Sequence, residues 1–352
     1  MTQTRAAINA FARFASKLQP EVFGDAKPEL ENALKFRPNP WQDTSKFLRR
    51  IAAILSVNNT AFIVPIETPS GELTGYYPVL PQMCEIVENA GKQYLRYTFE
   101  NGSRAAVELE KAGILTDFQY RSEFFGESNL ALRPVLDLIQ SQNQSIINSI
   151  KTSASIRFLA KLVNRTKTTD IIAERDRFAK ENLSGLNQSG IIMYDPMFSE
   201  LTPIEGKPVI INAAQMKSIN ESVFNYFGVS EKILQNNFSE DEFNAFYDGK
   251  IAPFALQLSL VMTNMTFTEN EIALGNKIEF SENRLMYASN KTKIDIASQS
   301  FDRGLMTINE VMDLWGRPHV PDGDKRFIRK EYTLIGDLGK EGANEEVKKN
   351  TP

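Results

Sequence analysis

The sequence predicts an α+β protein in which helices flank small antiparallel β-elements. Three observations support this class. Residues 1–20 carry apolar side chains at helical spacing. Residues 60–122 contain short β-like runs separated by Pro-Ser-Gly, Asn-Ala-Gly and Asn-Gly turns. Two long helical segments, 126–152 and 210–228, enclose an α/β stretch at 153–209, which we interpret as an insertion at the tip of a helical hairpin.

The composition is that of an ordinary soluble globular protein and argues against catalytic chemistry. Of the 352 residues, 42% are hydrophobic and 24% charged, and the net charge of −4 is not that of a protein that grips polyanions. The single Cys84 excludes internal disulfides and Cys-rich zinc sites, and it fits a reducing compartment. The single His319 excludes two-His metal motifs, and no Gly-rich phosphate loop is present. We therefore expect no cofactor, no metal and no catalytic residue.

The N-terminal segment allows two interpretations. It carries Arg5, Arg13 and Lys17 and no acidic residue, as a transit peptide would. Its apolar stripe favours the alternative, an amphipathic helix docked on the protein. The most apolar stretch, 251–262, is interrupted by polar residues and a proline, and it is shorter than the ~20 residues that a membrane span needs. We expect no membrane association.

The next elements follow from caps and turns. A helix over 29–37 must end before the two prolines of "FRPNPWQDTSKF". Asp43 or Thr44 can cap the following helix. In the β-rich region that follows, Cys84 is interpreted as a buried small hydrophobe.

The segment 126–152 is predicted to be a long helix that begins at Ser128. Its middle, "QSQNQS", is polar and uncharged, so its apolar stripe is too thin for packing against an ordinary core. It is either a solvent-bridging helix or a helix flanked on both sides by copies of itself.

The stretch 153–209 is predicted to contain a strand at 154–165, a helix at 170–182, and strands at 190–195 and 199–205. A run of basic residues lies at its start with no acidic residue between them. This basic cluster consists of Lys151, Arg157, Lys161, Arg165 and Lys167. It is either a solvated face or a contact for DNA or an acidic partner.

A loop is predicted at 229–240, with Ile233 and Leu234 anchoring its base. Its tip is uncharged and polar and consists of Gln235, Asn236 and Asn237. Asparagine tolerates the left-handed backbone that a tight loop needs. By itself, this pattern predicts an ordinary surface turn.

A helix follows at 241–265. Ser239 and Glu242 can form a capping box at its start, and Pro253 predicts a kink within it. A strand is expected within 276–289, and two short helices after it.

The stretch "FDRGLMTINEVMDLWGRPHVPDGD" resembles an active site because it gathers His319, Asp322 and Asp324. Its first half instead predicts structure: a left-handed Gly304, a capping box of Thr307 with Glu310, and a staple of Met306 on Val311. Its second half has the residue types of a turn. A lone histidine seldom makes a site, so we interpret the stretch as architecture.

The order of these features, together with five local strings, resembles the portal proteins of tailed bacteriophages from about residue 29 to 333. The strings are "LKFRPNPWQDTSKFLRRIAAILSVNNTAFIVPI", "GELTGYYPVLPQ", "SINESVFNYFGVSEKIL", "FYDGKIAPFALQLSLVMT" and "DRGLMTINEVMDLWGRPHVPDGD". The chain departs from the family in two ways. A histidine that often follows the first β-domain is absent from "DFQYRSEFF", and little chain remains after residue 333 for a crown.

The resemblance implies a portal-like subunit with the following parts: a wing at 1–125, a first stem helix at 126–152, a clip at 153–209, a second stem helix at 210–228, a tunnel loop at 229–240, a long helix at 241–265, wing or crown elements at 266–336 and a polar tail at 337–352. The function implied is a ring, usually of twelve subunits, at the capsid vertex. Double-stranded DNA would be packaged and ejected through it. Terminase and then a head–tail adaptor would dock on it.

The implied partners also include the major capsid and scaffolding proteins, with localisation in the virion and, during assembly, in the host cytoplasm. The resemblance implies no enzymatic activity, and the tip of 229–240 and the basic cluster become candidate DNA-channel residues. Two alternatives stay open. One is another ring protein of the head–tail junction, such as an adaptor. The other is a cytoplasmic enzyme that uses carboxylates such as Asp322 and Asp324.

Overall fold

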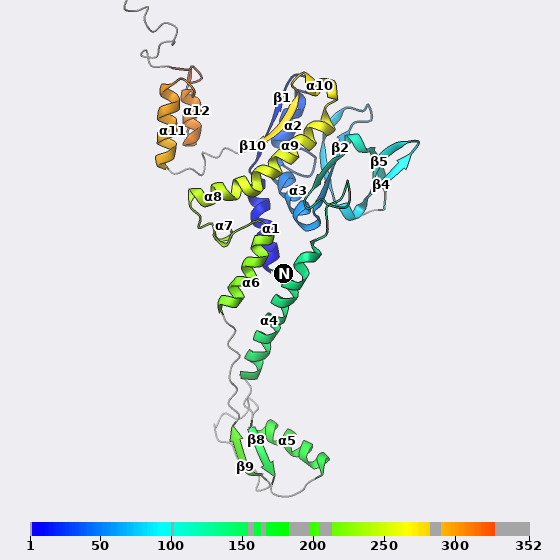
Figure 1. The fold of residues 1–352 in the computed structure, drawn as a ribbon, viewed down its shortest axis with the longest axis vertical. Helices are drawn as coiled ribbons and strands as arrows, with labels where there is room; N and C mark the ends of the chain where they lie inside the picture. The colour runs from blue at the N-terminus through cyan, green and yellow to red at the C-terminus, as the bar shows by residue number, and fades with distance from the viewer. Residues whose placement is uncertain are drawn as a thin grey trace, which may run out of the picture. The chain divides into compact units, whose positions relative to one another are not determined.

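A computed structural model describes residues 2–99, 102–153, 158–162, 167–182, 198–203, 213–281 and 290–327 (Figure 1). The chain divides into two compact units. The hairpin unit comprises Met1–Thr4 and Asn129–Tyr226, and the main unit comprises Arg5–Ser128 and Phe227–Pro352. Helices and small antiparallel sheets together confirm the predicted α+β class.

The N-terminal segment forms a docked helix, α1 (Thr2–Ala15), as its apolar stripe predicted. Phe11 is 2% exposed, and its ring lies edge-to-face on that of Phe254 with centroids 5.4 Å apart. The strand that follows, β1 (Gln19–Phe23), was not predicted from the sequence. It pairs antiparallel with β10 (Lys277–Ser281). This pairing joins the beginning of the main unit to its later part.

The prolines and caps act where the sequence predicted. Helix α2 (Glu29–Phe36) ends just before the two prolines that follow it. Helix α3 (Thr44–Asn58) begins at Asp43, whose carboxylate accepts a hydrogen bond from the backbone N–H of Lys46 at 2.8 Å. That backbone hydrogen bond lowers the pKa of Asp43. The helix ends at Asn59, which has a left-handed φ of 53°.

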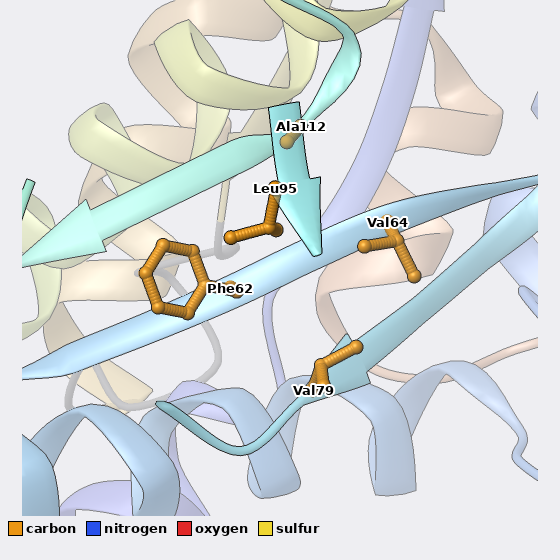
Figure 2. Packing of buried hydrophobic residues seen from close by; sticks show 5 residues of the cluster. All are labelled: Phe62, Val64, Val79, Leu95 and Ala112. Atoms are coloured by element: carbon orange, nitrogen blue, oxygen red, sulfur yellow. The ribbon is translucent and has the colours of Figure 1, made fainter. Parts of the chain in front are cut away.

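The β-rich region forms two three-stranded antiparallel sheets, with strand orders β3–β2–β7 and β4–β5–β6. The strands are β2 (Thr60–Glu67), β3 (Leu73–Val79), β4 (Cys84–Asn89), β5 (Lys92–Thr98), β6 (Arg104–Glu108) and β7 (Gly113–Thr116), with 3₁₀ turns at Pro81–Met83 and Leu109–Lys111. One apolar cluster joins the sheets. Figure 2 shows its buried side chains, Phe62, Val64, Val79, Leu95 and Ala112.

Cys84 packs against this cluster as a half-buried small hydrophobe, which agrees with the sequence analysis. Its thiol donates to the carbonyl oxygen of Leu80 at 3.4 Å. Burial raises the pKa of the thiol to about 12, because a thiolate would lose hydration there. The side chain is therefore held in its neutral form.

The predicted long helix is interrupted by a wider turn. Its parts are α8 (Glu240–Phe246), a π-helical turn (Tyr247–Ile251) and α9 (Ala252–Thr266). The capping box of Ser239 with Glu242 is formed as predicted. Pro253 lies in the first turn of α9, where the missing N–H of a proline costs least. The π-helical turn comes directly before α9. The helix type therefore changes just before Pro253, where the sequence predicted a kink.

Three short helices complete the main unit: α10 (Glu269–Ala273), α11 (Asn290–Asp302) and α12 (Ile308–Leu314). Helix α10 begins with a capping box of Thr268 and Glu271 that the sequence analysis did not single out. Among the helices described here, none is long and apolar enough to cross a membrane.

The hairpin unit contains a 3₁₀ turn (Asn129–Leu132), α4 (Arg133–Ser153), β8 (Phe158–Leu162), α5 (Thr168–Asn182), β9 (Phe198–Pro203) and α6 (Ala213–Tyr226). Helix α4 begins five residues later than the expected start at Ser128, because Pro134 suits the first turn of a helix. Strands β8 and β9 pair antiparallel, which confirms the strand expected within 154–165. The run at 190–195 lies outside the described residues.

Candidate functional site

The segment 229–240, expected to be a loop, contains a short helix, α7 (Glu231–Gln235). Ser230 caps it by accepting a hydrogen bond from the backbone N–H of Ile233 at 3.4 Å. Ile233 is fully buried, so it anchors the segment as predicted. The predicted loop is therefore more ordered than an ordinary surface turn.

The three candidate tip residues have different environments. Asn236 ends α7 with a left-handed φ of 55°, and its Oδ1 accepts a hydrogen bond from Nη2 of Arg13 at 2.8 Å. Gln235 donates from Nε2 to Oε1 of Glu231 at 3.1 Å. Asn237 is exposed. The tip is uncharged in itself, but a guanidinium from α1 lies against it, which the sequence analysis missed.

An aromatic cluster holds this segment against α1. The ring of Phe14 lies 6.0 Å from that of Phe238, 5.6 Å from that of Phe243 and 5.5 Å from that of Phe246, measured between centroids. Because Phe14 follows Arg13 directly, the packing that anchors α8 also fixes the position of the guanidinium at the tip. Sequence spacing gives no signal for this contact.

A second charged pair lies beside α7. Lys232 forms a hydrogen-bonded ion pair with Glu242, the residue that also closes the capping box of α8. This hydrogen bond, with the one from the backbone N–H of Ser239, lowers the pKa of Glu242. Two of the charges beside the tip are therefore paired with each other.

The polar middle of α4 leaves that helix with little buried surface. Ile139 is 3% exposed, whereas Leu138 is 46%, Ile147 44% and Ile150 62% exposed. At about 100° per residue, Leu138 and Ile147 lie on opposite flanks of the buried position, roughly 100° and 80° from it. The helix has a thin inner stripe and apolar residues on both sides of it.

The helix caps predicted in the stretch 301–324 are formed. Thr307 and Glu310 form the predicted capping box, and Gly304 has a left-handed φ of 71°. Nε2 of His319 lies 2.8 Å from Oδ1 of Asp313, and both side chains are more than half exposed. In the parts of the chain that the structure describes, no group of three or more His, Cys, Asp or Glu side chains could hold a metal ion.

A residue that the sequence analysis did not single out, Asn309, holds this stretch together. It is 4% exposed, donates from Nδ2 to Oδ1 of Asp324 at 2.7 Å, and accepts at Oδ1 from the N–H of Val320 at 2.9 Å. Its own N–H donates to the carbonyl oxygen of Gly323 at 3.0 Å. Asp324, a candidate catalytic carboxylate under the enzyme alternative, thus has a structural contact.

Comparison with known proteins identifies the family. The sequence model described as phage portal protein matches residues 2–316. The chain belongs to the phage portal protein family. No curated protein matches it.

Solved structures share the portal fold at low sequence identity. The neck of a native GTA particle with C12 symmetry matches with a TM-score of 0.61 and 12% identity, covering 91% of this chain and 94% of that one. The virion of a native gene transfer agent (GTA) particle matches at 0.60 and 13%, covering 91% and 93%. An HK97 family portal protein from Corynebacterium diphtheriae matches at 0.50 and 13%, covering 82% and 94%.

The structure describes three of the five residues in the predicted basic cluster of this portal protein. Lys151 lies near the end of α4, and Lys161 lies in β8, where the register pairs it with Glu200 of β9. Lys167 is exposed just before α5. The other two, Arg157 and Arg165, lie outside the described residues. The register adds an acidic neighbour that sequence order alone did not reveal.

Proposed function

We propose that this portal protein assembles into a ring of twelve subunits at one vertex of a phage capsid, and that double-stranded DNA is packaged and ejected through the ring. Membership of the portal family supports this, as does the fold shared with a neck of C12 symmetry. The proposal assigns no bond chemistry to the chain. ATP hydrolysis would belong to a separate terminase.

The observation that carries the ring is the exposure pattern of α4. A helix with one well-buried apolar position and apolar residues on both flanks gains little by standing alone, because Leu138 and Ile147 remain in water. A neighbouring copy on each side would cover both flanks. The remaining polar surface of α4 would then face the channel. Uncharged side chains there would not hold the phosphates of DNA.

The proposed parts keep the boundaries that the resemblance implies. The wing comprises 1–125, the clip 153–209 between stem helices at 126–152 and 210–228, and the tunnel segment 229–240. The long helix at 241–265, wing or crown elements at 266–336 and a tail at 337–352 follow. Strands β8 and β9 and helix α5 belong to the proposed clip.

The tunnel segment and the clip have different proposed roles toward DNA. The exposed Gln235 and Asn237 present neutral polar groups, which suit sliding. The basic cluster, with Lys151, Lys161 and Lys167, would contact DNA or an acidic partner near the clip. Terminase, and later a head–tail adaptor, would dock on the ring, which forms with capsid and scaffolding proteins in the host cytoplasm and remains in the virion.

Electron microscopy of the purified chain, together with native mass spectrometry, tests the proposal. We expect closed rings with a central channel and a mass of about twelve subunits. Because capsid or scaffolding protein can be needed for closure, the chain is also co-expressed with them. A chain that stays monomeric or dimeric under both conditions would contradict the proposed function.

A further inference from the structure

Helix α9 packs on two sides of the main unit and leaves a third side uncovered. On one side, Nε2 of Gln257 donates to the carbonyl oxygen of Thr116 at 3.0 Å. On another, Oγ of Ser259 accepts from the N–H of Phe280 in β10 at 2.9 Å. The uncovered side carries apolar residues at i, i+3 and i+7. These are Pro253, Leu256 and Leu260.

These three residues line a groove with a volume of about 460 Å³, whose wall also includes Phe11 and Leu55. Leu256 is 62% exposed and Leu260 56% exposed. Residues of α1, α3, β7 and α9 line the groove. Leu256 and Leu260 are one helical turn apart and border the same groove, so they form a contiguous apolar patch of the kind that protein–protein contacts use.

The charge of the groove is balanced. The charged side chains that line it, Lys250 and Asp117, pair with each other at 3.3 Å. A neutral apolar groove offers nothing to DNA phosphates or to a strongly charged peptide. It suits the apolar centre of a permanent contact between folded proteins.

A second exposed surface of the main unit is aromatic. Trp41 is 73% exposed, and its ring lies edge-to-face on that of Tyr77 with centroids 5.7 Å apart. The guanidinium of Arg50 covers the same Tyr77 ring at 5.0 Å and donates to its hydroxyl at 3.0 Å. Phe99 lines the same hollow as Tyr77 and is 42% exposed. We call Trp41, Arg50, Tyr77 and Phe99 the aromatic face.

The groove and the aromatic face border different sides of α3. Leu55 lines the groove, and Arg50 belongs to the aromatic face. Five residues of helix separate them, which is a rotation of roughly 140° around the helix axis. A closed ring needs this arrangement, because each subunit must meet its two neighbours through two different surfaces.

We propose that the α9 groove receives the aromatic face of the neighbouring copy in the ring, with Trp41 inserted between Leu256 and Leu260. Trp is the residue type most enriched at the energetic centre of such contacts. This inference rests on the proposed ring. It goes beyond it by naming the two surfaces through which the main units of neighbouring subunits meet.

The first test is a double variant in which both Leu256 and Leu260 are replaced by Lys. Its ring formation is measured by native mass spectrometry and microscopy. We expect at least a roughly tenfold loss of rings at equal protein concentration, because a charge cannot be buried unpaired in the contact. The matched control replaces Leu274 and Leu305, which are 83% and 63% exposed, with Lys. The control is expected to assemble like the wild type, and both variants should retain the wild-type circular dichroism.

The second test places the photo-crosslinking residue p-benzoyl-phenylalanine at 256 in assembled rings and maps the product by mass spectrometry. Crosslinks to the aromatic face of another copy support the proposal. Wild-type rings that crosslink elsewhere, or to a different protein, overturn it, as does normal assembly of the double-Lys variant. If the wild type forms no ring under any condition, the proposed function itself fails, which is a different result from rings without this contact.

Discussion

At the residue scale, a buried asparagine makes more of the contacts within 301–324 than the exposed histidine does. His319 is exposed and reaches one carboxylate, whereas the buried Asn309 joins the start of α12 to the turn at Val320 and Asp324. A rare residue type attracts attention in a sequence. The number of backbone groups that a buried amide satisfies becomes visible only in the fold.

Replacing Asn309 with Ala is expected to destabilise this stretch locally by about 2 kcal/mol, because the N–H of Val320 loses its acceptor and Asp324 loses a donor. Hydrogen exchange of the Val320 and Glu310 amides measures the loss. Replacing His319 with Ala is the control and should change protection little, since its contact is exposed. Equal effects of the two substitutions would refute this assignment.

Cys84 gives a second prediction at this scale. Because burial raises the pKa of its thiol to about 12, less thiolate is present at pH 8 than for an exposed cysteine. Reaction with a disulfide reagent at pH 8 should be slower by roughly 100-fold or more in the native protein than in denaturant. A Cys84→Ser, Ser70→Cys double variant, with its thiol on an exposed turn, is the control and should react fast in both states.

At the scale of elements, the features that could be predicted from the sequence were those set by residues close together in the chain, such as helix caps. The capping boxes at Ser239 and Thr307 need only residues three apart and were predicted, although the box of the same spacing at Thr268 was overlooked. The pairing of β1 with β10 joins segments more than 250 residues apart, and the contact of Arg13 with Asn236 joins residues 223 apart. Such contacts depend on the whole chain packing, which local spacing does not encode.

Asn236 tests how much the end of α7 depends on its backbone conformation. Its left-handed φ of 55° is strained for a β-branched residue, so Asn236→Val is expected to cost at least about 1 kcal/mol. Asn236→Gly keeps the backbone and loses only the exposed hydrogen bond from Arg13, so its effect should be a few tenths of a kcal/mol. Exchange of the Asn237 amide, which donates to the carbonyl oxygen of Lys232, reports both. A milder effect of Val than of Gly would contradict the argument.

At the scale of the whole molecule, a ring repeats every lining residue once per subunit. The family and the general architecture could be inferred from the sequence because five strings occur in the family's order. The surfaces that neighbours use could not, since Leu256 and Leu260 look like core residues of an apolar helix until their exposure is known. A surface that contacts a partner can be recognised only after folding, from the apolar side chains that the fold leaves exposed.

The same repetition makes the proposed tunnel segment testable. Asn236 is needed for the backbone, so the substitutions belong at its exposed neighbours, as Gln235→Lys with Asn237→Lys. If these residues face DNA, two added cations per subunit should slow genome packaging or ejection. The defect should shrink as salt rises, because counterion release weakens every phosphate contact.

Rates are measured at two salt concentrations, with Gln235→Ser, Asn237→Ser rings as the neutral control, after both variants are shown to assemble. The salt dependence separates phosphate contact from a distorted segment, since distortion would slow transport equally at both concentrations. Wild-type rates for the Lys variant at both salts would mean that the segment lies away from DNA. The ring could then still be a portal, with its grip on DNA in another part of the channel.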